Sequence, residues 1–283
     1  MTALCIEHLR LANFRCFEAL DVAFDPEVTV IFAENGGGKS TLLTALGMAL
    51  TLLQPKQRGD LALDGPRDAR RIPSDTAYSN QASSCGYACT ATIAAREGLT
   101  WSADVSSKAR KERHDVSRVT EALELVRGED VAWPLVAWYG TARFAGVSKR
   151  AAKPQTFTER ADGYAGALDP MTSDAPLLDW LRAEASDDLS RPRRGEPERH
   201  FDVAVYDAMR RAVPELREVW FDHGLKVPCM RFRSGRLSTW DDLSDGYHVV
   251  LGVVGDIARR ALLLNGMNGA DAVPDVQGVV MID

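Results

Sequence analysis

A glycine-rich segment at residues 33–40, Ala-Glu-Asn-Gly-Gly-Gly-Lys-Ser, constrains the fold more than any other feature of the sequence. It fits the P-loop pattern G-x-x-x-x-G-K-[ST] at every fixed position except the first, where Ala33 replaces glycine. A continuous apolar run at residues 28–32 precedes the loop, and residues 40–53 follow it with helical spacing. Because the run is apolar on both faces, it predicts a central strand of a covered sheet. The order is therefore strand, glycine loop, helix.

The chemistry of phosphate binding accounts for these residue types. Backbone N–H groups that wrap a phosphate need conformations that side chains obstruct, and glycine permits them. A lysine at position 39 places a cation against the β- and γ-phosphates, and the Ser40 hydroxyl is a hard oxygen ligand for Mg²⁺. We expect ATP and Mg²⁺ as cofactors. The loop and the first residues of the helix supply the predicted nucleotide-binding residues Asn35, Gly36, Gly37, Gly38, Lys39, Ser40 and Thr41.

Two segments near the end of the sequence fit the same chemistry. Residues 243–247, Leu-Ser-Asp-Gly-Tyr, stand at the start of a helix predicted over residues 245–264. There Ser244 and Gly246 provide a second anion-binding helix N-terminus, although Ser-Asp is also an ordinary N-cap. Residues 279–282 are apolar and lead to Asp283, the Walker B pattern that supplies a carboxylate for Mg²⁺. We therefore predict Ser40 and Asp283 as the metal ligands.

The rest of the chain alternates between strand and helix patterns. We predict an α/β fold, a mixed sheet around the P-loop helix with an antiparallel N-terminal part. A helical insertion is expected over about residues 145–215. The expected strands cover residues 6–14, 17–24, 87–93, 99–105, 133–139, 219–221, 227–232 and a buried 278–282, and the expected helices cover residues 120–126, 177–185 and 202–213.

Composition bounds the partners and the compartment. The net charge of -6 argues against a mainly electrostatic nucleic-acid coat, while leaving room for a local basic groove. The basic runs at residues 108–118 and 149–153 fit either phosphate contacts or, for the first, a solvated helix face. No apolar run approaches the roughly 18 residues of a membrane span, and the first residues do not form a signal peptide. We expect a cytoplasmic protein that binds no membrane. The five scattered cysteines are expected to be ordinary reduced thiols.

With the P-loop, the Ser244 segment and Asp283 in this order, the chain resembles the SMC/RecF-like branch of ABC ATPases, which are P-loop NTPases. Residues 9–17 are similar to the opening strand motif of that branch, which implies that Arg15 lies near the nucleotide. A closer resemblance is to bacterial AAA-family ATP-binding proteins of Septu and retron-associated antiphage systems. It is carried by the loop with Ala33, by Tyr-Gly-Thr-x-Arg at residues 139–143 and by Gly-Tyr-x-x-x-Leu-Asp-Pro at residues 163–170.

This resemblance implies an ATPase module that forms a homodimer around MgATP and gates an effector in antiphage defence. In such a dimer, Ser244 and Gly246 of one subunit complete the γ-phosphate site of the other. The implied partners are an effector nuclease and DNA or RNA. Two alternatives stay open: a non-hydrolysing, nucleotide-dependent binding module, and a DNA-repair ATPase of the RecF kind.

The resemblance also implies a glutamate directly after the Walker B aspartate, where it activates water. The sequence stops at Asp283, so we assign no catalytic residue. We expect one ABC-type ATPase domain over residues 1–283, truncated at its C-terminus, that binds nucleotide better than it hydrolyses it. The usual Q-loop glutamine is missing near Tyr139, and Gln81 and Gln155 are weak substitutes. Arg143 fits either a nucleotide or interface contact or a structural ion pair.

Overall fold

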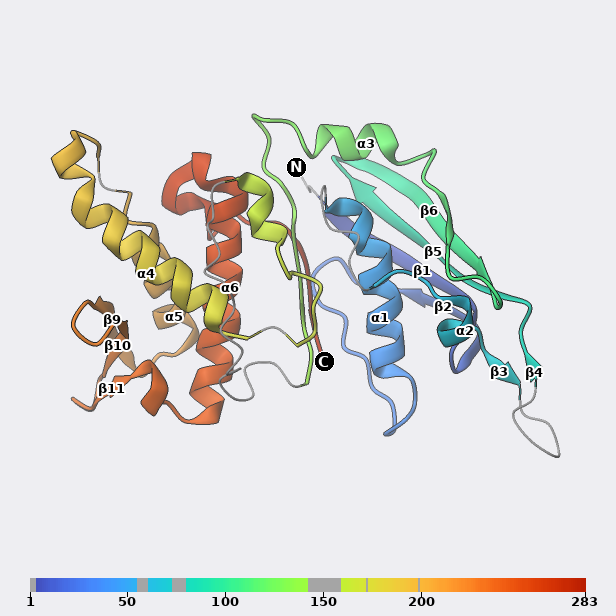
Figure 1. The fold of residues 1–283 in the computed structure, drawn as a ribbon, viewed down its shortest axis with the longest axis horizontal. Coiled ribbons are helices and arrows are strands. Elements are labelled where there is room, and N and C mark those ends of the chain that lie inside the picture. Colours follow the sequence, from blue (N-terminus) through green and yellow to red (C-terminus); the bar gives the residue numbers. More distant parts are fainter. Residues whose placement is uncertain (1–3, 55–60, 73–79, 142–158, 172, 198) are drawn as a thin grey trace. The chain divides into compact units, whose positions relative to one another are not determined.

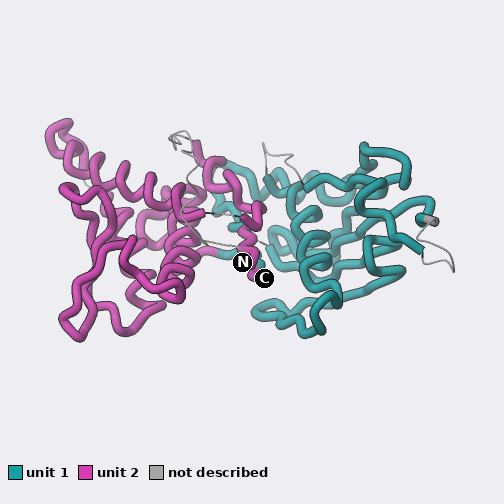
Figure 2. The backbone as a smooth tube through the Cα atoms, turned by 60° about the horizontal axis from the view of Figure 1, so that its bottom comes forward, with its two compact units in different colours: residues 1–136, 277–281, 283 teal, residues 137–276, 282 magenta. Residues whose placement is uncertain are grey.

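The protein has an α/β fold in the computed structural model, which describes residues 4–54, 61–72, 80–141, 159–171, 173–197 and 199–283 (Figure 1). The chain divides into two compact units (Figure 2). Unit 1 comprises residues 1–136, 277–281 and 283, and unit 2 comprises residues 137–276 and 282. The predicted basic run at residues 149–153, Arg143 and Gln155 lie outside the described residues.

Unit 1 is built on a five-stranded antiparallel sheet with the strand order β2-β1-β5-β6-β7. Alternate side chains of its long strands are buried, as the period-two pattern of a half-covered sheet requires. The predicted antiparallel N-terminal part and the predicted hairpin are confirmed. The strands are β1 (Leu4–Phe14), β2 (Phe17–Ala23), β5 (Ser84–Ile93), β6 (Arg96–Ser106) and β7 (Arg113–Asp115).

Helix α1 (Lys39–Leu50), which follows the glycine loop, packs on this sheet (Figure 1). Two sheet side chains fix its C-terminal end: the Tyr87 hydroxyl donates to the Met48 carbonyl at 3.3 Å, and Trp101 Nε1 donates to the Ala49 carbonyl at 3.0 Å. These carbonyls belong to the last turn, where no following helical turn supplies N–H donors for them. The sheet therefore holds the C-terminal end of α1, and the glycine loop leads into its N-terminal end.

Shorter elements complete unit 1. The predicted helix at residues 120–126 is confirmed as α3, whereas the solvated helix face expected at residues 108–118 is wrong. Part of that run is β7, which pairs with the edge of β6 and joins Arg113 to Asp104 by an ion pair at 2.7 Å. Pairing at an open sheet edge outweighs the local helix preference of the sequence. The remaining elements are η1 (Thr51–Leu53), α2 (Gly65–Asp68), β3 (Arg71–Ile72), β4 (Asn80–Gln81) and α3 (Thr120–Leu125).

Unit 2 packs three long helices, α4 (Ala175–Ser190), α5 (Phe201–Ala212) and α6 (Asp245–Asn265), around an antiparallel sheet of β9 (Leu216–Asp222), β10 (Val227–Phe232) and β11 (Leu237–Thr239). The three predicted helices and the predicted strand pair are confirmed. Helices α4 and α5 lie within the range predicted for a helical insertion, whose boundaries stay a prediction. The buried core includes Leu177, Trp180, Leu181, Val205, Met209, Met230, Trp240, Leu251 and Leu262. Short turns η2 (Arg160–Tyr164), η4 (Trp240–Asp242) and η5 (Gly266–Ala272) connect these elements.

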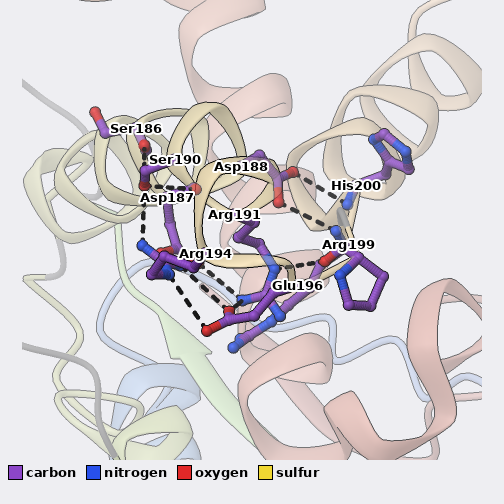
Figure 3. Close-up of polar contacts among 10 residues, drawn as sticks. Ser186, Asp187, Asp188, Ser190, Arg191, Arg194, Glu196, Arg199 and His200 are labelled. Atoms are coloured by element: carbon purple, nitrogen blue, oxygen red, sulfur yellow. Dashed lines mark hydrogen bonds and ion pairs between the residues drawn. The ribbon is translucent and has the colours of Figure 1, made fainter.

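A polar network closes the connection between α4 and α5, at η3 (Pro192–Arg194) (Figure 3). The Asp187 carboxylate accepts from Arg191 at 3.0 Å and from Arg194 at 2.6 Å. The Asp188 carboxylate accepts from the backbone amides of Arg199 and His200, each at 3.1 Å. The Arg- and Pro-rich stretch is therefore held against the end of α4 by its own charges.

Strands β8 (Leu135–Tyr139) and β12 (Gly278–Ile282) form a two-stranded sheet, and the division between the units runs through both. All five β8 residues are buried, which confirms the predicted covered strand. Strand β12 forms where predicted, but the expectation that it is buried is wrong, since of its five residues only Met281 is buried. A strand paired on one side only leaves its outer residues in water.

The central strand expected at residues 28–32 is also wrong. The segment has no strand structure, and Val28, Val30 and Phe32 are 71%, 63% and 89% exposed. Within the described residues no strand pairs with it, and a β-branched run becomes a strand only when neighbours accept its backbone hydrogen bonds. The local pattern fixed the apolar character of this segment but not its pairing.

Candidate nucleotide-binding site

The glycine loop of unit 1 turns directly into α1. Gly36 and Gly38 have φ angles of 83° and 89°, in the left-handed region that favours glycine. The Gly37 amide donates to the Glu34 carbonyl at 3.0 Å, which closes a turn. Gly38 is the N-cap of α1, and no side chain caps the first turn of this helix. The first amides of α1 and the positive end of its dipole therefore remain available to an anion.

Lys39 reaches back over the loop. Its exposed Nζ donates to the carbonyls of Ala33 at 2.7 Å and Glu34 at 3.0 Å. Carbonyl oxygens are weak partners for a cation compared with phosphate oxygens, which carry full charge. The ammonium is thus held at the loop by contacts that a phosphate can replace.

The predicted metal ligands meet in unit 1, although 243 positions separate them in the sequence. The Ser40 hydroxyl donates to Asp283 Oδ2 at 2.7 Å, at an exposed position. A hydroxyl and a carboxylate are the hard oxygen donors that Mg²⁺ takes, and this ion usually keeps several water ligands. The two side chains fit such an ion, and their role as its ligands stays a prediction.

Arg15 lies between the sheet and α1. Its Nε donates to Asp68 Oδ1 at 2.9 Å, and its Nη1 to the Thr44 hydroxyl at 3.5 Å. Thr44 stands one turn beyond Ser40 on α1, and its own hydroxyl donates to the Ser40 carbonyl at 2.6 Å. Burial alone would raise the pKa of Asp68, but hydrogen bonds from Arg67, the Asp64 amide and Arg15 outweigh it and lower this pKa. The ionised Asp68 therefore fixes the Arg15 guanidinium beside Thr44, one turn beyond Ser40 on α1.

The Ser244 segment forms the N-terminus of α6 in unit 2. Ser244 is the N-cap, yet its hydroxyl makes no hydrogen bond to the first helical amides. Ser244 and Gly246 are both exposed, and a Cβ added to Gly246 would meet nothing within 4 Å. The expected N-terminus of α6 is thus present. Among the described residues, no side chain caps its first amides, and the Ser244 hydroxyl does not bond to them.

Sequence reasoning missed the support behind this helix start. The buried Asp174 carboxylate accepts from Trp240 Nε1 at 2.8 Å and contacts His248 Nε2 at 3.0 Å, all within unit 2. His248 packs edge-on against the Trp240 ring, with centroids 5.1 Å apart. This cluster fixes the first turn of α6 from the inside. No sequence signal links residues 174, 240 and 248.

A second missed cluster lies in the core of unit 2. The Tyr139 hydroxyl donates to Asp256 Oδ2 at 2.9 Å, and this carboxylate also accepts from Arg259 at 2.6 Å and Arg260 at 2.7 Å. Burial disfavours the charge, but Arg260 and Arg259 outweigh it and hold the pKa of Asp256 below its ordinary range. Arg260 also donates to the carbonyls of Gly163 and Ala165. Tyr139 of β8 and the backbone of residues 163 and 165 are thus joined through the buried side chains of α6.

Other candidates have ordinary surroundings. Gln81 Nε2 donates to the Pro66 carbonyl at 3.2 Å, which gives it no special role. Cys85 and Cys89 are buried on β5, and burial raises the pKa of Cys85 to about 11, so this thiol stays protonated.

In the part of the chain that the structure describes, no cluster of three or more His, Cys, Asp or Glu side chains is arranged for a metal ion. No described helix is long and apolar enough to cross a membrane.

Comparison with known proteins found sequence similarity over parts of the chain. Residues 8–126 match the AAA domain family model. The chain is 32% identical to the DNA replication and repair protein RecF of Corynebacterium jeikeium over 131 residues, which are 44% of this chain and 30% of RecF. It is 44% identical to the DNA double-strand break repair Rad50 ATPase of Halobacterium salinarum over 70 residues, which are 24% of this chain and 7% of that one.

Among solved structures, the Smc head domain of Pyrococcus furiosus, bound to the C-terminal domain of ScpA, superposes with a TM-score of 0.53. That comparison covers 99% of this chain and 89% of the Smc chain at 11% identity, so it shows the fold alone. The predicted α/β fold of the ABC type is confirmed, and parts of the chain are similar in sequence to the AAA domain, to RecF and to Rad50. It spans less than a third of the RecF chain that it matches.

Proposed function

We propose that this chain is an ATP-binding module of an ABC-type ATPase in which nucleotide joins two copies of the protein. The hydrogen bond between Ser40 and Asp283 carries the proposal, because it brings the two predicted metal ligands together at the N-terminal end of α1, directly after the glycine loop. Homology to RecF and to the Rad50 ATPase supports it. Units 1 and 2 together are proposed to form one ATPase domain.

The residues of unit 1 divide the binding task. The amides of residues 36–40 wrap the phosphates, and the Lys39 ammonium exchanges the Ala33 and Glu34 carbonyls for phosphate oxygens. Arg15, held by Asp68, adds a fixed positive charge near the start of α1. Ser40 and Asp283 would hold Mg²⁺, which neutralises charge on the phosphate oxygens when bound. Asn35 and Thr41 flank this cradle.

Dimerisation would use unit 2. The exposed Ser244 hydroxyl and the open space at Gly246 are proposed to receive the γ-phosphate held by the other copy. The anion would meet the first amides of α6, at the positive end of its dipole. Two nucleotides would then lie between two copies of the protein. Loss of a γ-phosphate would let the two copies separate.

The module is proposed to gate an effector, with antiphage defence as the role and a nuclease as the effector. The second candidate, a RecF-like function in DNA repair, is favoured by the similarity to RecF. Both roles take DNA or RNA as a partner. They differ in the trigger, since a repair protein responds to DNA structure alone and a defence module to a component of the phage.

Lys39→Ala is expected to weaken ATP binding by about tenfold to a hundredfold, because it removes a charge-assisted contact to the phosphates. Calorimetric titration of the purified chain with ATP and Mg²⁺ measures the effect. Lys111→Ala removes an exposed lysine of unit 1 outside the glycine loop and should leave the affinity unchanged. Equal affinities of the Lys39 and Lys111 variants would contradict the proposed site.

Ser244→Asp separates dimerisation from binding. Aspartate is as good an N-cap as serine, so α6 should keep its stability, but the new carboxylate repels a γ-phosphate. The variant should bind ATP with unchanged affinity and lose ATP-dependent dimerisation, as measured by light scattering after size exclusion. Ser244→Asn, a neutral N-cap of the same shape, is the control and should retain most dimer. A Ser244→Asp variant that dimerises like the wild type would refute the role of α6.

A further inference from the structure

Unit 2 contains a surface pocket of about 560 Å³ whose lining is dominated by arginine. Arg210 and Arg211 come from the last turn of α5, Arg217 comes from β9, and Arg233 comes from the turn after β10. The other two lining residues are Asp207 and Leu216. Four guanidinium groups and one carboxylate thus surround a single hollow in a chain whose net charge is -6.

Internal contacts leave much of this charge available. Arg210 pairs with Asp207, and Arg233 Nε donates to the Pro214 carbonyl at 2.7 Å. Within the part of the chain that the structure describes, the one ion pair of Arg217 is a long contact of 3.6 Å to Glu218, which also pairs with Arg231. Arg211 is exposed and has no ion pair or hydrogen bond among the described residues. The carbonyls at the C-terminal end of α5 favour cations there, so they help to hold Arg210 and Arg211 in place.

Two further arginines of unit 2, on β10 and in the turn after it, stack on aromatic rings. The Arg231 guanidinium lies 6.0 Å from the centre of the Trp220 ring, and that of Arg236 lies 4.1 Å from the centre of the Phe232 ring. Arginine stacked on a ring keeps its N–H edge free for hydrogen bonds in the ring plane. Arg231 and Arg236 are therefore held by these rings, but they are not among the six residues that line the pocket.

We propose that this arginine pocket, defined by Arg210, Arg211, Arg217 and Arg233, binds the phosphodiester backbone of a nucleic acid. Arginine presents a planar fork that matches two phosphate oxygens, and several such forks close together suit a polymer that carries a phosphate at each step. The pocket is open and its arginines are largely exposed, which suits a chain that lies across it more than a small anion enclosed by it. The inference rests on the proposal that the module has DNA or RNA as a partner.

The test measures fluorescence anisotropy of labelled 20-nucleotide single-stranded DNA, single-stranded RNA and duplex DNA with the full chain. Arg211→Gln/Arg217→Gln removes two pocket charges that have few internal contacts, so the fold should persist. Arg182→Gln/Arg193→Gln, also in unit 2, removes two exposed arginines outside the pocket and is the matched control. The pocket variant should bind at least one nucleic acid about tenfold more weakly than the control. Its salt slope should fall by about two, one for each lost phosphate contact.

Four results would overturn the inference. First, the pocket and control variants could have equal affinities, and second, the pocket substitutions could leave the salt slope unchanged. Third, inorganic phosphate could compete fully at the concentration of the nucleic-acid phosphates. Fourth, none of the three nucleic acids could bind. The third result would show that the pocket binds a small anion only. The fourth would mean that the pocket binds an acidic protein surface instead of a nucleic acid. ATP titration of the same samples keeps the two proposals apart, because neither substitution touches the glycine loop. If the two variants bind ATP normally and do not differ in nucleic-acid affinity, the inference about the pocket is wrong and the proposed ATP-binding function still stands.

Discussion

Asp256→Ala is expected to lower the free energy of unfolding by about 3–5 kcal/mol, because it leaves two buried arginines without their shared counter-charge. The side chain of Asp256 is 3% exposed, and those of Arg259 and Arg260 are 1% and 2% exposed. Water cannot replace the lost partner at this depth. The substitution also removes the acceptor of the Tyr139 hydroxyl.

Acid should act on the same cluster. The pKa of Asp256 is lower in the folded protein than the value of about 3.9 in an unfolded chain. A group with a lowered folded pKa contributes stability above its unfolded pKa and loses it as the pH falls toward the folded one. The contribution of Asp256 should therefore be complete above about pH 5 and decline below about pH 4. The variant should lack this part of the acid dependence.

Urea unfolding, followed by tryptophan fluorescence, measures the loss, because four of the six tryptophans, among them the buried Trp180 and Trp240, belong to unit 2. Asp179→Ala is the matched control, since it removes an aspartate that also pairs with an arginine on a helix, but at an exposed site. An exposed pair contributes about 0–1 kcal/mol, so the control should change little. Similar losses in both variants would mean that the Asp256 cluster adds no more than a surface pair.

The comparison of Asp256 with the glycine loop shows what sequence reasoning can reach. Residues 33–40 carry their geometry locally, because glycine at positions 36 and 38 permits the left-handed backbone that the loop adopts. The helices and most strands were predictable for the same reason, since their periodicity lies within each segment. The clusters of Asp256 and Asp174 depend on distant partners: Asp256 meets Tyr139 across 117 positions, and Asp174 meets Trp240 across 66. Nothing local marks such pairs.

Residues 28–32 and 278–282 show the opposite limit. Both apolar runs predict buried strands, yet the first forms no strand and the second is mostly exposed. Burial of a strand depends on neighbours on both sides and on both faces, which a local pattern does not supply. The pairing of Ser40 with Asp283, in contrast, follows from a motif whose chemistry demands that the two side chains meet.

Gly38→Ala is expected to abolish measurable ATP binding and to destabilise unit 1 by about 2–5 kcal/mol, through two additive causes. At a φ of 89°, alanine costs about 1–2 kcal/mol relative to glycine. Its Cβ would also lie 2.4 Å from Cζ of Phe17 and 2.9 Å from Sγ of Cys16, so the loop or the ring must move, at a cost of about 1–3 kcal/mol. Since Gly38 is the N-cap of α1, any shift misdirects the amides that receive the phosphates.

Gly36→Ala separates the two causes. Gly36 has a similar φ of 83°, but its added Cβ meets nothing within 4 Å, so only the backbone cost of about 1–2 kcal/mol remains. ATP titration and urea unfolding of both variants should therefore place Gly38→Ala well below Gly36→Ala. Adding Phe17→Leu to Gly38→Ala removes the clashing ring atom and should restore part of the stability and of the ATP affinity. If Gly36→Ala and Gly38→Ala were equally impaired, or if Phe17→Leu gave no recovery, contact between the Phe17 ring and the loop would not be what requires glycine at position 38.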